Sequence, residues 1–189
     1  MPETRPPADI AGLSLAEIAK LADEQRLPPV DRWNPAHCGD SEMRIARDGS
    51  WHHQGSPINR PAMVRLFSTL LRREADGRFV LVTPVEKLDI AVDDAPFVAT
   101  ELVSEGEGGA RRLAFRLNTG DLVVADANHP LRIERREDGP HPYLLVRPGL
   151  EALIARPVFY ELAALALGEH ATPPGLWSDG AFFPLDDPR

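Results

Sequence analysis

The segment 54–61, which reads QGSPINRP, carries side chains suited to binding an anion. Pro61 fits the first turn of a helix, where its missing N–H costs nothing, and it pushes Arg60 out of helical backbone angles into the cap position. A cation at a helix N-terminus opposes the helix dipole, so a nearby anion would stabilise Arg60 there. We therefore predict that Arg60, the Ser56 hydroxyl and the first helical N–H groups bind a phosphate or carboxylate. An ion pair with one of the 29 acidic residues is the alternative explanation.

A second candidate set follows a buried strand in the segment 82–87, which reads VTPVEK. The end of a strand presents functional groups from a rigid base, and Lys87 is one of two lysines in the chain. The alternative is a solvated strand end on which Glu86 and Lys87 face outward. With Arg44 added, the predicted ligand-binding residues are Arg44, Ser56, Arg60, Thr83, Glu86 and Lys87.

Histidine, cysteine and aspartate residues are present, but their spacing predicts neither a metal site nor a catalytic centre. His37, Cys38 and Asp40 lie almost adjacent in one loop, and neighbouring ligands fit the tetrahedral geometry of zinc poorly. His52 and His53 would point to opposite faces of a strand. A nucleophilic cysteine would need a neighbouring base that the sequence does not identify. We therefore predict no catalytic residue, no metal and no cofactor.

The composition predicts a cytoplasmic globular protein that binds neither nucleic acid polymers nor a membrane. The formal charge of −8 and the pI near 5.2 produce a field that repels polyanions. No apolar run approaches the roughly 20 residues of a membrane span, and the segment 1–10 lacks the pattern of a signal peptide. A single cysteine excludes an internal disulfide, which agrees with a reducing compartment.

Hydrophobic periodicity predicts a small sheet and one helix in the first half of the chain. A Pro-rich arm precedes a short helix that begins with the capping box formed by Ser14 and Glu17. The Asp48-Gly49 pair predicts a hairpin after an irregular segment at 30–42, with strands at 43–47 and 50–54. A helix follows at 58–71, and then three strands at 78–82, 87–92 and 96–103.

The second half has the pattern of a sheet followed by a helix. The segment 104–110, SEGEGGA, is rich in glycine and acid and predicts a linker. Four short strands separated by turns then predict an antiparallel meander that leads into a helix at 154–167. The tail 168–189 is too rich in Pro and Gly for regular structure, although its aromatic residues predict that it docks on the body.

The two predicted helices resemble each other in sequence. INRPAMVRLFSTLL at 58–71 and IARPVFYELAALAL at 154–167 share an Ile-x-Arg-Pro start and the same five-position apolar stripe. We interpret this as an internal duplication, and the alternative is that two ordinary helices converged on one start signal. The second helix is apolar nearly all round and is expected to lie between the halves.

The predicted fold class is therefore α+β, with two related halves that are each a small antiparallel sheet closed by one helix. The predicted domains are 1–34, an N-terminal arm with its short helix; 35–104, the first α+β domain; and 105–189, the second domain with the tail. A meander followed by a closing helix is also the order of elements in a pleckstrin-homology domain. Such likeness of fold does not by itself predict activity.

Three stretches resemble a bacterial family known as domain of unknown function 1285: CGDSEMRIARDGSWHHQGSPINRP, LVTPVEKLDIAVDDAPFVA and YLLVRPGLEALIARPVFYEL. The resemblance covers roughly residues 35–167. It implies a two-domain α+β fold with duplicated structural motifs and a second half similar to a pleckstrin-homology domain. It also implies a small, nucleotide-like ligand held between the halves and a role in signal transduction. No catalytic residues of the family can be transferred to this chain.

The leading functional hypothesis is a non-enzymatic ligand-binding or sensing module with a small anionic ligand at the interface of the two halves. One alternative is an enzyme acting on a phosphorylated small molecule, with Lys87, Glu86 or a histidine as the acid or base. Another alternative is a protein-interaction scaffold without a small ligand. Such a scaffold would use the aromatic tail and the second helix as its contact surface for a protein partner.

Overall fold

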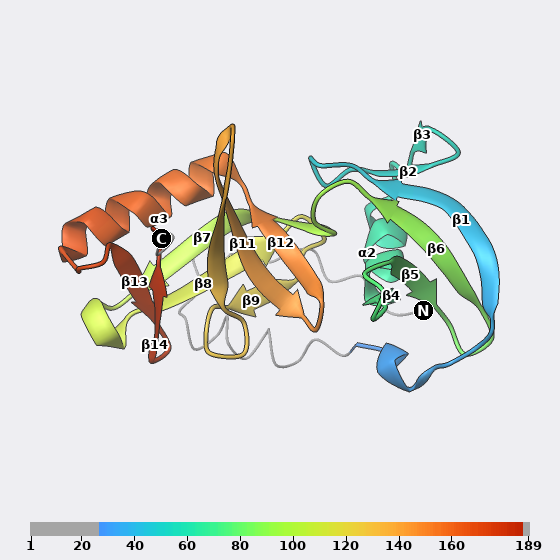
Figure 1. Ribbon diagram of the computed structural model, residues 1–189, viewed down its shortest axis with the longest axis horizontal. Coiled ribbons are helices and arrows are strands. Elements are labelled where there is room, and N and C mark those ends of the chain that lie inside the picture. Colours follow the sequence, from blue (N-terminus) through green and yellow to red (C-terminus); the bar gives the residue numbers. More distant parts are fainter. Residues whose placement is uncertain (1–26, 187–189) are drawn as a thin grey trace.

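The computed structural model describes residues 27–186, which form two similar halves side by side (Figure 1). Each half is a six-stranded mixed sheet with one helix, and a separate two-stranded hairpin follows the second half. This confirms two related α+β halves. The predicted short helix that begins near Ser14 lies outside the described residues. No helix within 27–186 is long and apolar enough to cross a membrane.

The first half contains six strands and α2. Its elements, in chain order, are the 3-10 turn η2 (Val30–Arg32), β1 (His37–Ile45), β2 (Trp51–His53), β3 (Ser56–Pro57), α2 (Pro61–Thr69), β4 (Leu71–Arg73), β5 (Phe79–Val82) and β6 (Lys87–Val92). The predicted hairpin at Asp48-Gly49 is present as the β1–β2 pair. The start of β1 differs from the prediction. Residues 37–42 were expected to be irregular, but they belong to β1, which pairs with β6 from His37 onward with an irregular register near Gly39.

The second half contains six strands, α3 and the terminal hairpin. Its elements are β7 (Phe97–Glu105), the 3-10 turn η3 (Gly108–Ala110), β8 (Arg112–Leu117), β9 (Leu122–Val124), β10 (Leu131–Arg136), β11 (Gly139–Arg147), β12 (Leu150–Ile154), α3 (Arg156–Glu169), β13 (Gly175–Ser178) and β14 (Ala181–Pro184). The tail therefore has regular structure, contrary to expectation, because β13 and β14 pair as a hairpin. It does dock on the body: the Ser178 hydroxyl accepts from the Leu113 N–H at 2.9 Å and donates to the Ala125 carbonyl at 2.6 Å.

The strand β7 belongs to the second sheet, where it lies between β12 and β8. The change from one sheet to the other therefore falls in residues 93–96, whereas the sequence placed the domain boundary at 104. The glycine-rich segment 104–110 does not link the halves. It joins β7 to β8, which pair antiparallel from Ala99 to Glu105, so it is the turn of a hairpin within one sheet.

The two sheets share one topology. Their strand orders are β3-β2-β1-β6-β5-β4 and β10-β11-β12-β7-β8-β9. When the strands of each half are numbered from one to six, both orders read 4-5-6-1-2-3, the first sheet being read in reverse. In both halves the first and sixth strands pair in parallel, as β1 with β6 and β12 with β7. The sheets are therefore mixed, and the purely antiparallel sheets expected from the sequence are not present.

The helices that suggested the duplication do not occupy equivalent positions. In the first half α2 lies between the third and fourth strands, whereas α3 follows the sixth strand of the second half. The shared Ile-x-Arg-Pro start therefore reflects a common preference for proline in the first helical turn. The helix α3 also does not lie between the halves. It packs on β7 and β13, and its outer residues Tyr160 and Leu167 are 63% and 71% exposed (Figure 1).

The halves contact each other through turns that meet at their seam. The Asn118 side chain, in the β8–β9 turn, donates to the Gly49 carbonyl at 3.1 Å and accepts from the Val98 N–H at 3.0 Å. At a second point, the partly buried Arg147 guanidinium donates to the Ser68 carbonyl at the end of α2 at 2.7 Å. Apolar residues of both halves form one continuous core around these contacts.

The close approach at Gly49 can be tested with Gly49→Ala. The Gly49 φ is +85°, and an added Cβ would lie 2.6 Å from Asn118 Nδ2 and 2.9 Å from Val98 Cγ2. We expect a loss of about 2–4 kcal/mol in the free energy of unfolding, from backbone strain plus overpacking. Gly55→Ala is the matched control, because Gly55 has φ +79° but open space around its Cβ, so it should lose only about 1–2 kcal/mol. Equal losses in urea unfolding would contradict the packing at the seam.

Candidate functional site

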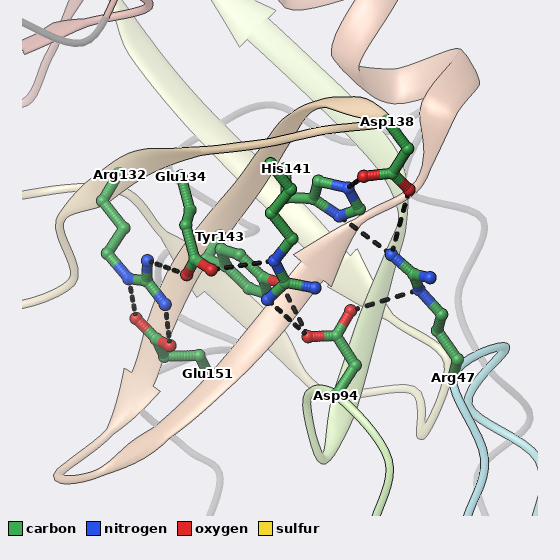
Figure 2. A network of polar contacts seen from close by, with 9 residues as sticks. Arg47, Asp94, Arg132, Glu134, Asp138, His141, Tyr143 and Glu151 are labelled. Atoms are coloured by element: carbon green, nitrogen blue, oxygen red, sulfur yellow. Dashed lines mark hydrogen bonds and ion pairs between the residues drawn. The ribbon is translucent and has the colours of Figure 1, made fainter.

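A buried carboxylate lies in the connection between the two sheets. The Asp94 side chain is 6% exposed. Its Oδ1 accepts from the Tyr143 hydroxyl at 2.6 Å and from Arg136 Nη2 at 3.3 Å. On the other side, Arg47 Nε from the β1–β2 hairpin lies 3.4 Å from Asp94 Oδ2 (Figure 2). Asp94 thus joins a turn of the first half to two strands of the second.

The Tyr143 hydroxyl stays protonated in this setting. Burial raises the pKa of Tyr143 well above its usual range, and its hydrogen bond to the Asp94 carboxylate raises it further. The guanidinium of Arg132 lies over the Tyr143 ring, 4.4 Å from its centroid. Arg132 is itself held by Glu151 through contacts of 2.6 and 2.7 Å (Figure 2). The arginines of this network are therefore already neutralised by carboxylates.

His141 extends the network toward the first half. Its Nδ1 lies 3.1 Å from Arg47 Nη2, and its Nε2 lies 2.8 Å from Asp138 Oδ1 (Figure 2). Because a guanidinium can only donate, Nδ1 must accept, and the ring hydrogen therefore resides on Nε2 and is donated to Asp138. This hydrogen bond is the main cause that lowers the pKa of Asp138. We call Arg47, Asp94, Arg132, Glu134, Arg136, Asp138, His141, Tyr143 and Glu151 the seam network.

Beside the network lies a cleft of about 590 Å³, which we call the seam cleft. The first half contributes the end of the β1–β2 hairpin and the start of α2, and the second half contributes β7, β8 and the β8–β9 turn. Its lining includes two arginines and no aspartate or glutamate. Its lining includes the side chains of Trp51, Asn59, Val64, Arg65, Arg116 and Leu117.

Two smaller hollows at the seam differ from this cleft because they contain carboxylates. One of about 480 Å³ is lined by Asp138 next to Arg47 and His141. The other, of about 140 Å³, is lined by Asp94 and Glu151 together with arginines of the network. In these hollows Arg47, Arg132 and Arg136 already pair with the carboxylates, and the exposed Arg156 shares the lining of the larger hollow with Asp138. The seam cleft is therefore the better candidate for binding an external anion.

The two cations of the cleft are held differently. Arg116 is 9% exposed, and its Nε donates to Glu101 at 3.2 Å. The guanidinium of Arg65, on α2, has no ion pair or hydrogen bond with any residue in 27–186. Its stem extends toward the second half, since a Cβ at Gly120 would lie 3.9 Å from Arg65 Cδ. The indole N–H of the buried Trp51 also lacks a hydrogen-bond partner within the described chain.

The six residues predicted from the sequence are not brought together. Arg44 makes a two-contact pair with Asp93 at 2.8 and 2.7 Å. Ser56 is exposed on β3, and Arg60 is the exposed N-cap of α2, between two residues that line the seam cleft. Arg60 is thus placed at the cap as expected, but it is not among the residues that line the cleft.

The remaining three predicted residues lie at the other end of the first sheet. The Thr83 hydroxyl accepts from the backbone N–H of Glu86 at 3.0 Å, and Lys87 Nζ lies 3.8 Å from Glu74. Lys87 pairs with His37 at the start of β1, whereas β2 pairs with β1 only from Met43 onward. His37 and Met43 are six positions apart along β1. At about 3.3 Å per residue this separates Lys87 from Ser56 by on the order of 15–20 Å. They therefore cannot share one small ligand.

The residues considered for metal binding do not form a site. His37 Nε2 contacts Asp89 at 3.0 Å, and Cys38 is exposed with its thiol on the Ala36 carbonyl. Across residues 27–186, no group of three or more His, Cys, Asp or Glu side chains could hold a metal ion.

The fold and the seam cleft define an α+β protein of two similar halves with a candidate ligand site between them. Family models described as the N-terminal domain of the "Domain of unknown function (DUF1285)" and the C-terminal domain of the "Protein of unknown function (DUF1285)" match residues 28–95 and 96–185. The chain belongs to the DUF1285 family. The border between these models coincides with the change of sheet.

One crystal structure supports this assignment, and a second one shares the fold. A DUF1285 family protein from Silicibacter pomeroyi DSS-3 is 48% identical with a TM-score of 0.76, and the match covers 89% of this chain and 93% of that chain. One from Shewanella baltica OS155 is 22% identical with a TM-score of 0.51, covering 69% of this chain and 93% of that one, and this likeness shows the fold alone. No curated protein matches the chain.

The seam network can be tested with Tyr143→Phe. This change removes the 2.6 Å hydrogen bond to a buried carboxylate, so we expect a loss of about 1–3 kcal/mol in the free energy of unfolding. Tyr160→Phe is the matched control, because Tyr160 is 63% exposed and should cost almost nothing. Urea unfolding of both variants measures the difference. A Tyr143→Phe protein as stable as the control would show that Asp94 does not depend on this hydroxyl.

Proposed function

We propose that this protein is a non-enzymatic binding module for a small anionic ligand, which it holds in the seam cleft between its two halves. The observation that carries the proposal is the charge of the lining. In a chain with a net charge of −8, a cleft of about 590 Å³ has two guanidinium groups and no carboxylate among its lining residues. Concave sites lined by one sign of charge focus the field and attract the opposite charge.

The size and the walls of the cleft also support a small organic ligand. Binding sites for small molecules span about 300–1,000 Å³ and combine apolar walls with a few placed polar groups. Here the apolar side chains Trp51, Val64 and Leu117 lie near Arg65 and Asn59. A nucleotide, the class implied by the family resemblance, is one anionic ligand of suitable size.

A role in sensing follows from the position of the cleft. Both halves supply walls, so a bound ligand makes contacts with both and stabilises the arrangement in which they are adjacent. Such a ligand would act on the relation of the halves without any chemical step. This mode of action is what we propose for signal transduction in this protein.

The geometry favours binding over turnover. Glu86 and Lys87, the acid–base candidates of the enzyme hypothesis, lie at the far end of the first sheet. Ser50 does line the cleft, but its hydroxyl donates to Asp48 at 2.6 Å and lies 3.0 Å from the His52 ring. Because its one proton is directed at a carboxylate within the same turn, this hydroxyl is engaged locally.

Anilinonaphthalene sulfonate, an anion with an apolar ring system, can test the proposal. We expect the full-length folded protein to bind it at one site with enhanced fluorescence, and Thr100→Trp to block binding because Thr100 lines the cleft. Arg65→Ala should weaken binding roughly tenfold, through loss of one charged contact. Arg156→Ala, an exposed arginine on α3, is the matched control and should bind normally. Unchanged binding by both cleft variants would contradict a ligand site at the seam.

A further inference from the structure

We infer that the ligand of the seam cleft is a monoanionic organic acid, a single carboxylate on an aromatic or branched hydrocarbon body. This inference rests on the proposed function and narrows it. It selects against nucleotides, whose phosphate groups carry more charge and whose sugar and base carry many polar groups. Three features of the cleft support it: the number of unpaired cations, the apolar walls and the few polar side chains that are not already engaged.

The first feature is charge balance. Arg116 already has Glu101 as a partner at 3.2 Å, whereas Arg65 has no acidic partner within residues 27–186. The pair Arg116–Glu101 contributes little net charge, so the cleft presents an excess of about one positive charge. Charge that enters a low-dielectric cleft without a partner is strongly unfavourable. A ligand with one negative charge is therefore balanced, and a phosphate dianion or a polyphosphate is not.

The second feature is the apolar wall. Trp51 is 2% exposed and stacks against Phe67 of α2 with ring centroids 6.4 Å apart, so the ring is held rigidly and only a small part of it reaches the cleft. Most of the accessible apolar lining comes from the partly exposed Ile58 and Val64 and from the exposed Pro57 and Pro61. An apolar surface of this kind contributes binding energy in proportion to the hydrocarbon area that the ligand buries against it. A ribose with its hydroxyl groups would lose hydrogen bonds to water here without replacement.

The third feature is the scarcity of unengaged polar groups. The Asn118 amide already bridges Gly49 and Val98, and the Thr119 hydroxyl donates to Asp121 at 2.7 Å. Ser50 is held by Asp48. The Thr100 hydroxyl donates to the Arg116 carbonyl at 3.4 Å. Within the described chain this leaves the side chains of Asn59 and Arg65 and the indole N–H of Trp51 as the polar groups of the lining that have no such bond. One guanidinium and one amide match the two oxygens of a carboxylate, and they are too few for the base, sugar and phosphate of a nucleotide.

The position of Arg65 also explains why the acid group would meet both halves. Arg65 begins on α2 in the first half, and its stem points toward the turn that contains Gly120, where an added Cβ would lie 3.9 Å from Arg65 Cδ. A carboxylate bound by this guanidinium therefore lies where α2 faces the β8–β9 turn. The hydrocarbon body then extends toward Trp51 and Leu117, along the wall that the two halves share.

Isothermal titration of the full-length protein with three compounds tests the inference. Phenylbutyrate carries one carboxylate, phenylbutyramide is its neutral isostere, and AMP represents nucleotides. We expect phenylbutyrate to bind roughly tenfold to a hundredfold tighter than the amide, the range of a hydrogen-bonded charged contact, and tighter than AMP. In Arg65→Ala the affinity for phenylbutyrate should fall to the affinity for phenylbutyramide, while the affinity for phenylbutyramide stays unchanged. Arg156→Ala should keep the full preference for the acid.

The outcomes separate this inference from the proposed function. If AMP binds more tightly than phenylbutyrate, or if the acid and amide bind equally to the wild-type protein, the ligand class is wrong although the cleft still binds a ligand. If Thr100→Trp and Arg65→Ala leave the binding of sulfonate, acid and AMP unchanged, both the site and the inference fail. A preference for the acid that disappears only with Arg65 supports both.

Discussion

The buried carboxylate of Asp94 is the contact on which the arrangement of the halves depends. It lies in the segment that joins the two sheets, directly before the buried residues Ala95 to Phe97. A buried charge is tolerated only when it is paired, and its partners here come from both sides: Arg47 from the first half, and Arg136 and Tyr143 from the second. Loss of register at the seam would leave this charge unpaired. The seam network therefore fixes how the halves meet, and with that the walls of the seam cleft.

The two sheets have the same topology, but the seam is asymmetric because the helices are inserted at different places. In the first half α2 interrupts the order after the third strand, and this places its start against the turn at Gly120. In the second half α3 follows the sixth strand and packs on β7 and β13, away from the first half (Figure 1). Of the two helices, α2 therefore lines the seam cleft, whereas the start of α3 lines the hollow of about 480 Å³. The two sheets are thus alike in strand order, and the different insertion of the helices makes the surroundings of the seam unequal.

Local patterns in the sequence predicted most elements and the family, but not the candidate site. The Asp48-Gly49 turn, the helix start at Pro61 and the strand at 79–82 depend on residues close in sequence, so propensity and spacing suffice. Arg65 gave no local signal, since it stands on the polar side of an amphipathic helix, like many solvated arginines. Its significance arises from the turn at 118–120, which lies more than 50 positions away in the sequence and approaches α2 only where the two halves meet at the seam. The expected ligand residues at 83–87 are local to one strand end, and the strand order, which depends on long-range pairing, places that end away from Ser56 and Arg60.

The seam is held without a ligand, and this determines what a ligand can do. Asn118 bridges Gly49 and Val98, and burial lowers the pKa of Arg147, whose guanidinium nevertheless donates to the Ser68 carbonyl and lies 5.3 Å from the Phe97 ring centroid. These contacts of Asn118 and Arg147 act in addition to the network around Asp94. Together they hold the walls of the cleft in place before a ligand binds. Because the site is already ordered, little of the interaction energy of a ligand is lost in ordering it, and the binding affinity is higher. Occupancy of a preformed cleft adds to the stability of an existing arrangement, so the response to the ligand should be a stiffer seam rather than a large movement of one half against the other.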